Sequence, residues 1–148
     1  MNAIPSPTVR DALQAYLDAN GFRTDAYDAP TFTLQFLGRD LTFPNTKARA
    51  RAIPLHDLHH VATGYGTDLI GEAEIGAWEL GAGCETFIVY ALNATAVIVG
   101  CFLSPRRVLA AYRRGLGGRT LYRSDLSYDD AKRLSVDDLR RALGVEPA

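Results

Sequence analysis

The chain has 148 residues, of which 47% are hydrophobic and 22% charged, and its net charge is −1 at neutral pH. This length suits one domain with a hydrophobic core, and the composition is that of an ordinary soluble globular protein. The balanced charge gives no general attraction to nucleic acid, and the sequence has no glycine-rich phosphate loop, Gly-x-Ser-x-Gly elbow or CxxC pair. Nucleic-acid binding, nucleotide-driven chemistry and serine hydrolysis are therefore not expected.

A helix and a β-hairpin are predicted for the N-terminal part of the chain. The Ser6-Pro7-Thr8 start and the apolar face of residues 8–20 predict a helix that ends at Gly21. Residues 31–43 alternate between apolar and polar side chains, which predicts a hairpin with its bend near Gly38.

From Pro54 onward, after a basic link over residues 47–53, the chain is predicted to be helical. A capping pattern at Ser135 and a glycine at Gly144 delimit the last helix. The expected fold is a single domain over residues 1–148, mainly α with a small N-terminal β-hairpin. The expected helices cover residues 54–64, 68–82, 84–103 and 105–114, with two short pieces near the end.

The segment Thr86–Leu103 is almost entirely apolar, and its length is at the lower limit for a membrane span. Because Asn93 and Thr95 interrupt it, a central helix surrounded by the rest of the domain is favoured over a span. Cys84 and Cys101 lie in apolar surroundings, and we expect both to be reduced core residues. No signal peptide is visible, so a cytoplasmic location is expected.

All three histidines of the chain lie in the run His56-Asp57-Leu58-His59-His60. At about 100° per residue, a helix places His56, Asp57 and His60 on one side and His59 on the other flank. Two histidines four residues apart are a common way for one helix to offer two imidazoles to a single ion. Glu72 would join them from the next helix, so we expect one divalent metal: zinc first, with iron, manganese or magnesium as alternatives.

The acidic residues of this region are open to more than one interpretation. Glu72 and Glu79 fall on an apolar stripe of the second helix, where carboxylates are costly unless they are paired or bound to metal. Glu79 is the candidate catalytic residue, for proton transfer. Asp57 is either a fourth metal ligand or an acceptor that orients a histidine. The alternative to a metal site is an ordinary solvated polar face on an amphipathic helix.

The pattern His-Asp-x-x-His, followed after eleven residues by Glu, resembles the signature of the coenzyme Q (ubiquinone) biosynthesis family of the Coq-four type, and the resemblance extends over residues 54–145. It implies a mostly helical protein with one divalent metal held by His56, Asp57, His60 and Glu72. It also implies an apolar cleft for isoprenoid or fatty ligands, association with membrane surfaces, and oxidative removal of the C1 carboxyl group from a prenylated hydroxybenzoate. The resemblance is also consistent with a homo-oligomer or with membership of a biosynthetic complex.

The sequence also departs from the family pattern. Residues 1–53 differ from the usual N-terminal helices, His59 stands where an aromatic residue is common, and Ala82 stands where glutamine is common. We therefore expect an apolar or prenylated carboxylated ring as substrate, but not a particular compound. The alternative is a non-catalytic lipid-binding or scaffold module with a structural metal. A phosphohydrolase is disfavoured because no histidine precedes His56.

Two further groups of residues have both a functional and a structural interpretation. The aromatic residues could line a ligand cleft or pack in the core. The basic residues could bind an anion or form a solvated face neutralised by the acidic residues at 125, 129 and 130. The aromatic group is Trp78, Tyr65 and Tyr90, and the basic group is Arg106, Arg107, Arg113, Arg114, Arg119 and Arg123.

Overall fold

The computed structural model describes residues 5–36 and 38–146, and within these residues the chain is mainly α-helical with one two-stranded sheet, as predicted. Two short 3-10 helices, which the sequence did not predict, lie at η1 (Thr24–Asp28) and η2 (Leu121–Arg123). The strands are β1 (Thr31–Phe36) and β2 (Arg39–Pro44). The helices are α1 (Val9–Asn20), α2 (Lys47–Thr63), α3 (Leu69–Ala82), α4 (Phe87–Leu103), α5 (Pro105–Leu116), α6 (Tyr128–Arg133) and α7 (Val136–Leu143).

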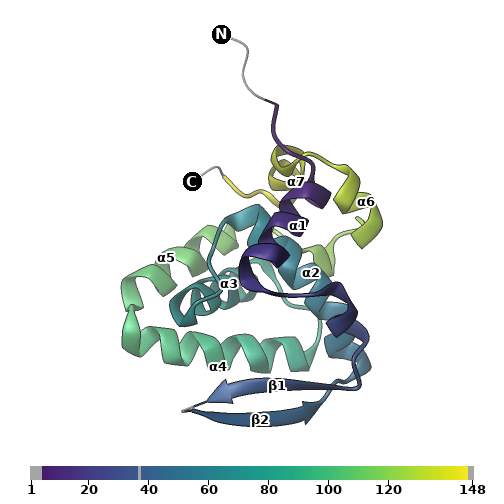
Figure 1. The fold of residues 1–148 in the computed structure, drawn as a ribbon. Helices are drawn as coiled ribbons and strands as arrows, with labels where there is room; N and C mark the ends of the chain where they lie inside the picture. Colours follow the sequence, from purple (N-terminus) through teal and green to yellow (C-terminus); the bar gives the residue numbers. More distant parts are fainter. Residues whose placement is uncertain (1–4, 37, 147–148) are drawn as a thin grey trace.

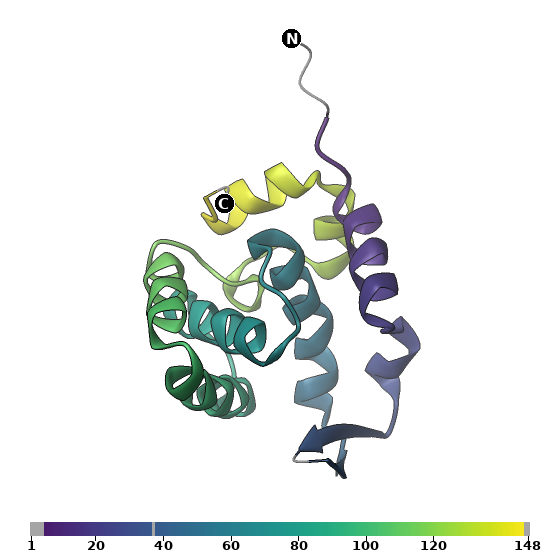
Figure 2. The same cartoon turned by 60° about the vertical axis from the view of Figure 1, so that its left-hand side comes forward.

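Helix α2 lies between two groups of helices (Figures 1 and 2). On one side, α3 packs closely against α4 and α5. On the other side, α1 packs against α2, α6 and α7. The hairpin lies near the beginning of α2, away from α7 (Figure 2). Because α2 contacts both groups, residues on its different faces meet quite different neighbours.

The main core joins these helices around Trp78 of α3 and Leu58 of α2, both fully buried. Leu139 of α7 and Val9 of α1 close the same cluster from the other side. Burying side chains of this size contributes about 1.5–3 kcal/mol each. Trp78 is therefore a core residue, whereas Tyr65 is half-buried and Tyr90 is exposed.

Helix α2 begins at Lys47, seven residues before the predicted start at Pro54, so the predicted basic link was wrong. The Thr46 side chain caps the helix by accepting a hydrogen bond from the Arg49 amide, which satisfies a free backbone donor. Pro54 lies inside the helix, where the missing amide costs one helical hydrogen bond. Proline is common in the first turn of a helix, and for this reason the helix was predicted to begin at Pro54.

Other predicted boundaries are confirmed to within a few residues. The side chains of Thr8 and Ser135 cap α1 and α7, and Gly21 and Gly144 end these helices in left-handed conformations. Helix α4 starts at Phe87 rather than residue 84 because the Thr86 side chain caps it.

The predicted hairpin is confirmed as an antiparallel pair in which Thr31 lies opposite Pro44. Gly38 adopts a φ of 74° in the turn, where an L side chain would be strained. Leu37, which completes the predicted bend, lies outside the described residues. The Phe32 and Phe43 rings stack with centroids 5.6 Å apart.

Helix α4 is not surrounded by the domain, so that prediction was wrong. Its inner face packs on α3, where Asn93 approaches Gly76 and Gly100 approaches Ala73. Its outer face leaves Phe87 and Phe102 87% and 86% exposed. No helix in the described part of the chain has both the length and the apolar character needed to cross a membrane.

Candidate metal centre

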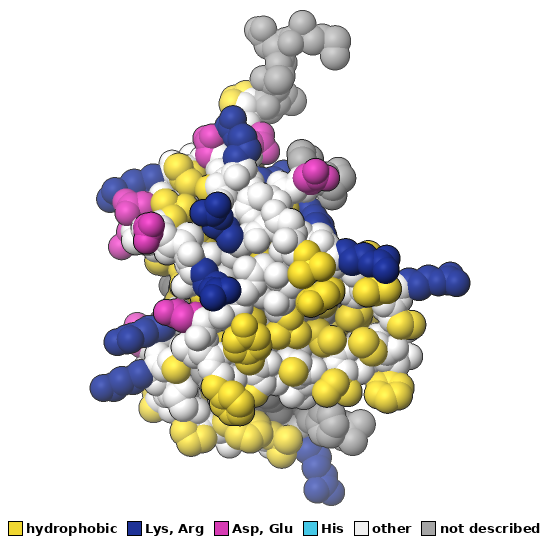
Figure 3. Space-filling model, turned by 180° about the vertical axis from the view of Figure 1, so that it is seen from behind, with side chains coloured by type: hydrophobic (Ala, Val, Ile, Leu, Met, Phe, Trp, Pro, Cys, Tyr) yellow, Lys and Arg dark blue, Asp and Glu magenta, His cyan; other side chains and the backbone are white. Residues whose placement is uncertain are grey.

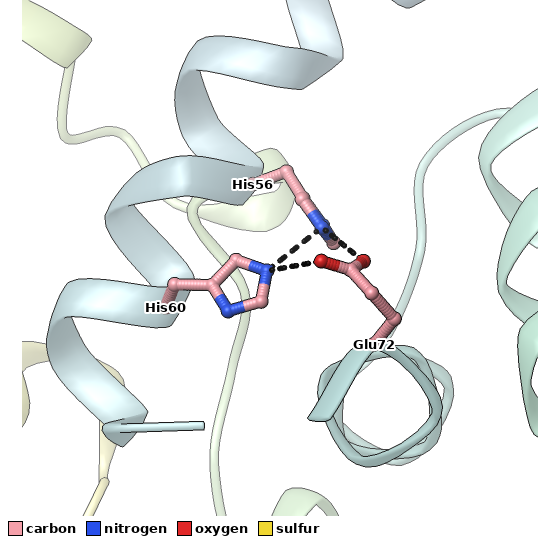
Figure 4. Close-up of side chains that lie close together, drawn as sticks. All are labelled: His56, His60 and Glu72. Carbon is pink, nitrogen blue, oxygen red and sulfur yellow. Dashed lines mark hydrogen bonds and ion pairs between the residues drawn. The ribbon is translucent and has the colours of Figure 1, made fainter. Parts of the chain in front are cut away.

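Two histidines of α2 and one carboxylate of α3 point toward a common position (Figure 4). The Nε2 atoms of His56 and His60 lie 3.2 Å apart, and the Glu72 oxygens lie 3.6 Å and 3.5 Å from them respectively. Two ligand atoms bound tetrahedrally at about 2.1 Å from an ion are separated by about 3.4 Å. The three side chains already stand at the spacing of a tetrahedral metal site.

The other ring nitrogens of the two histidines fix which nitrogen carries hydrogen. His60 Nδ1 lies 2.9 Å from the Tyr65 carbonyl oxygen, which can only accept, so Nδ1 must donate. His56 Nδ1 donates to the Glu79 carboxylate over 2.8 Å. In the neutral form of both rings, the Nε2 atoms therefore present lone pairs to each other and to Glu72. Such an arrangement needs a positive charge among the three groups, which either a metal ion or a proton on one Nε2 atom supplies.

The surrounding charges agree with that requirement. Burial disfavours a charged His56 ring, but the Glu79 and Glu72 carboxylates outweigh it and raise the pKa of His56 well above its usual range. Burial likewise disfavours a charged Glu72, but His56 and His60 outweigh it and lower the pKa of Glu72 to about 2. Glu72 is therefore an anion at neutral pH, as a metal ligand must be.

The turn between α2 and α3 brings Glu72 to the histidines. Gly64 ends α2 with a φ of 78°, which favours glycine, and Asp68 caps α3 by accepting from the Gly71 amide. A Cβ on Gly71 would lie 2.1 Å from the Gly66 carbonyl oxygen, so the turn folds tightly against the first turn of α3. Glu72 follows directly in that first turn.

Glu79 occupies a position behind His56, not at the proposed ion. Its fully buried carboxylate accepts from four donors on three different elements. Burial opposes its charge, but His56 and His59 outweigh the burial and hold the pKa of Glu79 well below its usual range. A residue so enclosed can orient its neighbours, and proton transfer by Glu79 stays a prediction. The donors are His56 Nδ1, His59 Nδ1, Asn93 Nδ2 and the Tyr122 hydroxyl.

His59 lies outside the group formed by His56, His60 and Glu72, as its helical position predicted. Its Nδ1 donates to Glu79 over 2.6 Å, and its Nε2 accepts from the Leu121 amide over 2.9 Å. Burial lowers the pKa of His59, so the ring is neutral. His59 thus connects Glu79 to the backbone of η2.

Asp57 is placed differently from what the resemblance implied, since it does not belong to the group formed by His56, His60 and Glu72. Its two oxygens accept from the hydroxyls of Tyr16 and Tyr27. One residue beyond His56 on α2, its side chain faces α1 and η1 instead of α3. The Tyr16 ring in turn stacks on His60, with centroids 5.4 Å apart, so Tyr16 contacts both Asp57 and His60.

Four polar residues around the site were missed by the sequence prediction, and one of them carried a usable signal. Asn93 is a buried amide within an otherwise apolar helix, which in itself indicates a polar partner. The partners of Tyr16, Tyr27 and Tyr122 depend on contacts between distant parts of the chain and left no local signal.

A cavity of about 450 Å³ lies beside His60, between α1, α2 and α7. Tyr16 and Tyr65 give it aromatic walls, and Arg140 contributes a guanidinium group. On the α3 side, the Glu72 side chain is 40% exposed. Solvent can therefore reach the group of three ligands.

The arginines of residues 106–123 were expected to be neutralised by the acidic residues at 125, 129 and 130, but the salt bridges and hydrogen bonds are different ones. Arg107 binds Glu74 through two hydrogen bonds, and Arg114 donates to the Thr63 carbonyl oxygen. The acidic residues at 129 and 130 pair instead with neighbours on α6.

Both cysteines are free, but only Cys84 is in the core, so the prediction for Cys101 was wrong. Burial raises the pKa of Cys84 to about 11, which disfavours a redox role.

No protein-family model matches this sequence, and a search of curated proteins finds no similar protein. The resemblance to the coenzyme Q family therefore stays a prediction that rests on the motif and its spacing.

Proposed function

We propose that this protein is a metal-dependent enzyme that binds one divalent ion through His56, His60 and Glu72. Zinc is the first candidate, because nitrogen ligands with one carboxylate at tetrahedral spacing suit it, and iron or manganese are alternatives. Three protein ligands leave one coordination position for water or substrate, which is the usual arrangement of a catalytic zinc site.

The observation that carries the proposal is the pair of Nε2 atoms 3.2 Å apart with both Nδ1 atoms already donating. With both rings neutral and no metal ion bound, the two lone pairs repel each other and the Glu72 carboxylate; a proton on His56 Nε2 is the alternative that a bound ion would displace. An ordinary solvated face would let these side chains separate, yet the His60 side chain is fully buried and held by the Tyr65 carbonyl. The alternative of a purely polar surface is therefore disfavoured.

The proposed substrate is an apolar or prenylated aromatic ring that carries a carboxylate, as the family resemblance implies. The cavity beside His60 supports an aromatic ligand, because Tyr16 and Tyr65 line it. Arg140 also lines the cavity, but its Nε donates to the Ala62 carbonyl oxygen and its Nη1 lies 3.5 Å from Asp137 Oδ1, so it is already paired within the protein. A bound divalent ion would polarise the substrate carboxylate or activate water or oxygen. The proposed reaction is oxidative replacement of the ring carboxyl group by hydroxyl: the carboxyl carbon leaves as CO₂, water supplies the hydroxyl oxygen, and dioxygen takes up the two electrons and two protons as H₂O₂. Zinc has no redox chemistry, so electron transfer through the metal would require iron or manganese.

The second candidate function is a lipid-binding module with a structural metal. The exposed apolar residues of α4 favour it, since they could contact a lipid-like molecule. The two functions differ at the fourth coordination position, which is open in an enzyme and closed in most structural sites. The absorption spectrum of the cobalt-loaded protein, with and without added azide, tests this: a shift on addition supports the enzyme, and an unchanged spectrum supports the module.

Metal content is the first test of the site. We expect one zinc, iron or manganese ion per chain in the wild type by elemental analysis with native mass spectrometry. His60→Ala and Glu72→Gln should lose it, because each removes one of three ligands. Glu85→Gln, which changes an exposed carboxylate just beyond α3, is the matched control and should keep it. Full metal content in His60→Ala would refute the assignment.

A further inference from the structure

The His60 ring is held from several sides. Its Nδ1 donates to the Tyr65 carbonyl oxygen, and the His56 ring lies edge-on to it, with ring centroids 4.8 Å apart. Tyr16 of α1 covers the ring as well: the two rings stack with centroids 5.4 Å apart and an angle of 23° between their planes. The His60 side chain is fully buried, and no histidine is visible on the face of the molecule that Figure 3 shows. The direction of His60 Nε2 therefore depends on these neighbours.

The hydrogen bond to Tyr65 does not fix that direction by itself. An imidazole can still turn about the line from Nδ1 to its acceptor, because the χ2 torsion of histidine is broad. A second ring stacked on the imidazole limits this rotation, since turning would make the two rings collide, and offset stacking at this separation is favourable in itself. Tyr16 thus restricts the tilt of the His60 ring, whose Nε2 faces His56 and Glu72 (Figure 4).

A carboxylate of the neighbouring helix anchors Tyr16. The Tyr16 hydroxyl donates to Asp57 Oδ1 over 3.2 Å, and the Tyr27 hydroxyl donates to Asp57 Oδ2. A carboxylate only accepts hydrogen bonds, so both phenols are the donors. Asp57 is buried, and these two hydrogen bonds give each of its oxygens a partner. Asp57 therefore fixes the position of the Tyr16 hydroxyl, and with it the ring that covers His60.

We infer that Tyr16 is a positioning residue of the proposed metal centre. Its ring holds His60 at the tilt at which Nε2 meets the ion, and Asp57 holds the ring through the hydroxyl. The inference rests on the proposed metal site and adds to it a residue of α1, a helix that supplies none of the ligands His56, His60 and Glu72. Tyr16 also lines the cavity beside His60, so a molecule bound there would touch the residue that holds His60.

The family pattern gives Asp57 a different role, that of a ligand of the ion. For that role one of its oxygens would have to leave Tyr16 or Tyr27 and turn toward α3. The two roles predict different effects of removing the Tyr16 hydroxyl. If Asp57 anchors Tyr16, the loss loosens the ring and weakens ion binding. If Asp57 is a ligand, the loss frees its carboxylate and leaves ion binding unchanged or stronger.

Zinc affinity, measured by competition with a chelator, tests the inference. Tyr16→Phe keeps the stacked ring but loses the anchor, and we expect its Kd to rise about threefold to tenfold. Tyr16→Leu loses the ring as well, and we expect a rise of about tenfold to 100-fold. The absorption bands of the cobalt-loaded protein should also change in Tyr16→Leu, because the tilt of His60 alters the ligand field. A purely structural role would lower stability without changing these bands.

Tyr128 provides the matched control. Like Tyr16, it is half-buried and packs against the main core, but its ring lies under the Lys132 ammonium group of α6. Tyr128→Phe and Tyr128→Leu should keep the wild-type Kd and the wild-type cobalt bands, although Tyr128→Leu should lower the free energy of unfolding as Tyr16→Leu does. Circular dichroism would verify that all variants are folded at the temperature of the measurement.

The possible outcomes separate this inference from the proposed function. A wild type that takes up neither zinc nor cobalt would overturn both. If the wild type binds the ion and Tyr16→Phe has an unchanged or lower Kd, the inference alone is overturned. Equal losses of affinity in Tyr16→Leu and Tyr128→Leu would overturn it as well, because they would reflect a general loosening of the core.

Discussion

Glu79 is a single buried side chain that would prepare the proposed metal site without contacting the ion. Its carboxylate keeps hydrogen on Nδ1 of His56, which leaves Nε2 free for the metal. It also holds His59, which binds the Leu121 amide, and Asn93 of α4. Partners that orient a metal-binding histidine in this way are commonly a carboxylate or a carbonyl, and here His56 has the first and His60 the second.

Glu79→Gln should weaken metal binding by about 10- to 100-fold while leaving all three ligands in place. An amide has only one acceptor oxygen and adds an NH₂ group that must face one of the present donors. Competition with a chelator would measure the affinity. Tyr122→Phe is the control, because it removes only one donor and should lower the free energy of unfolding by about 1 kcal/mol. An unchanged affinity in Glu79→Gln would contradict this role.

At the scale of helices, glycines decide how closely α5 approaches α3. A Cβ on Gly115 would lie 2.2 Å from the Trp78 carbonyl oxygen, and one on Gly81 would lie 2.5 Å from the Tyr112 carbonyl oxygen. The two backbones are therefore in direct contact at these positions. Helix α3 carries both Glu72 and Glu79, so this contact fixes the position of both residues relative to α5.

Gly115→Ala should lower the free energy of unfolding by about 1–3 kcal/mol, because the added methyl group cannot fit without moving a backbone. Gly117→Ala is a close control: its nearest neighbour would be 3.9 Å away, and its φ of −87° suits alanine. We expect the control to be neutral or slightly stabilising. Chemical denaturation of both variants would measure the difference, and equal stabilities would mean that α5 can shift freely.

At the scale of the whole molecule, the proposed site joins two parts of the fold. Helix α3 packs mainly on α4 and α5, whereas α2 also contacts α1, α7 and η1. An ion held by His56 and His60 on one helix and by Glu72 on the other would link these parts. Binding that is confined to the folded state raises stability by mass action.

Metal loading should therefore raise the melting temperature. At a free ion concentration about 100 times the Kd, the gain is about 2.7 kcal/mol, or about 5–10 °C for a domain of this size. Differential scanning calorimetry of the chelator-treated and zinc-loaded protein would measure it. The His60→Ala variant should show no shift. A shift of the same size in that variant would place the stabilising ion elsewhere.

Local patterns in the sequence predicted the α-helices, apart from the start of α2, as well as the hairpin and the candidate ligands His56 and His60. Capping side chains at Thr8 and Ser135 and the glycine at Gly144 act within a few residues, so their effect can be read locally. The spacing of four residues between His56 and His60 places both on one side of any α-helix. The apolar period of the second helix also indicated that Glu72 needs a partner.

What each side chain faces depends on contacts between distant parts of the chain. Asp57 meets Tyr16 and Tyr27 because α1 and η1 cover that side of α2, and nothing near residue 57 in the sequence encodes this packing. The same holds for the outer face of α4, which is as apolar as a buried helix yet stays exposed. Local hydrogen bonding fixes where a helix begins and ends, but burial depends on which distant elements arrive against it.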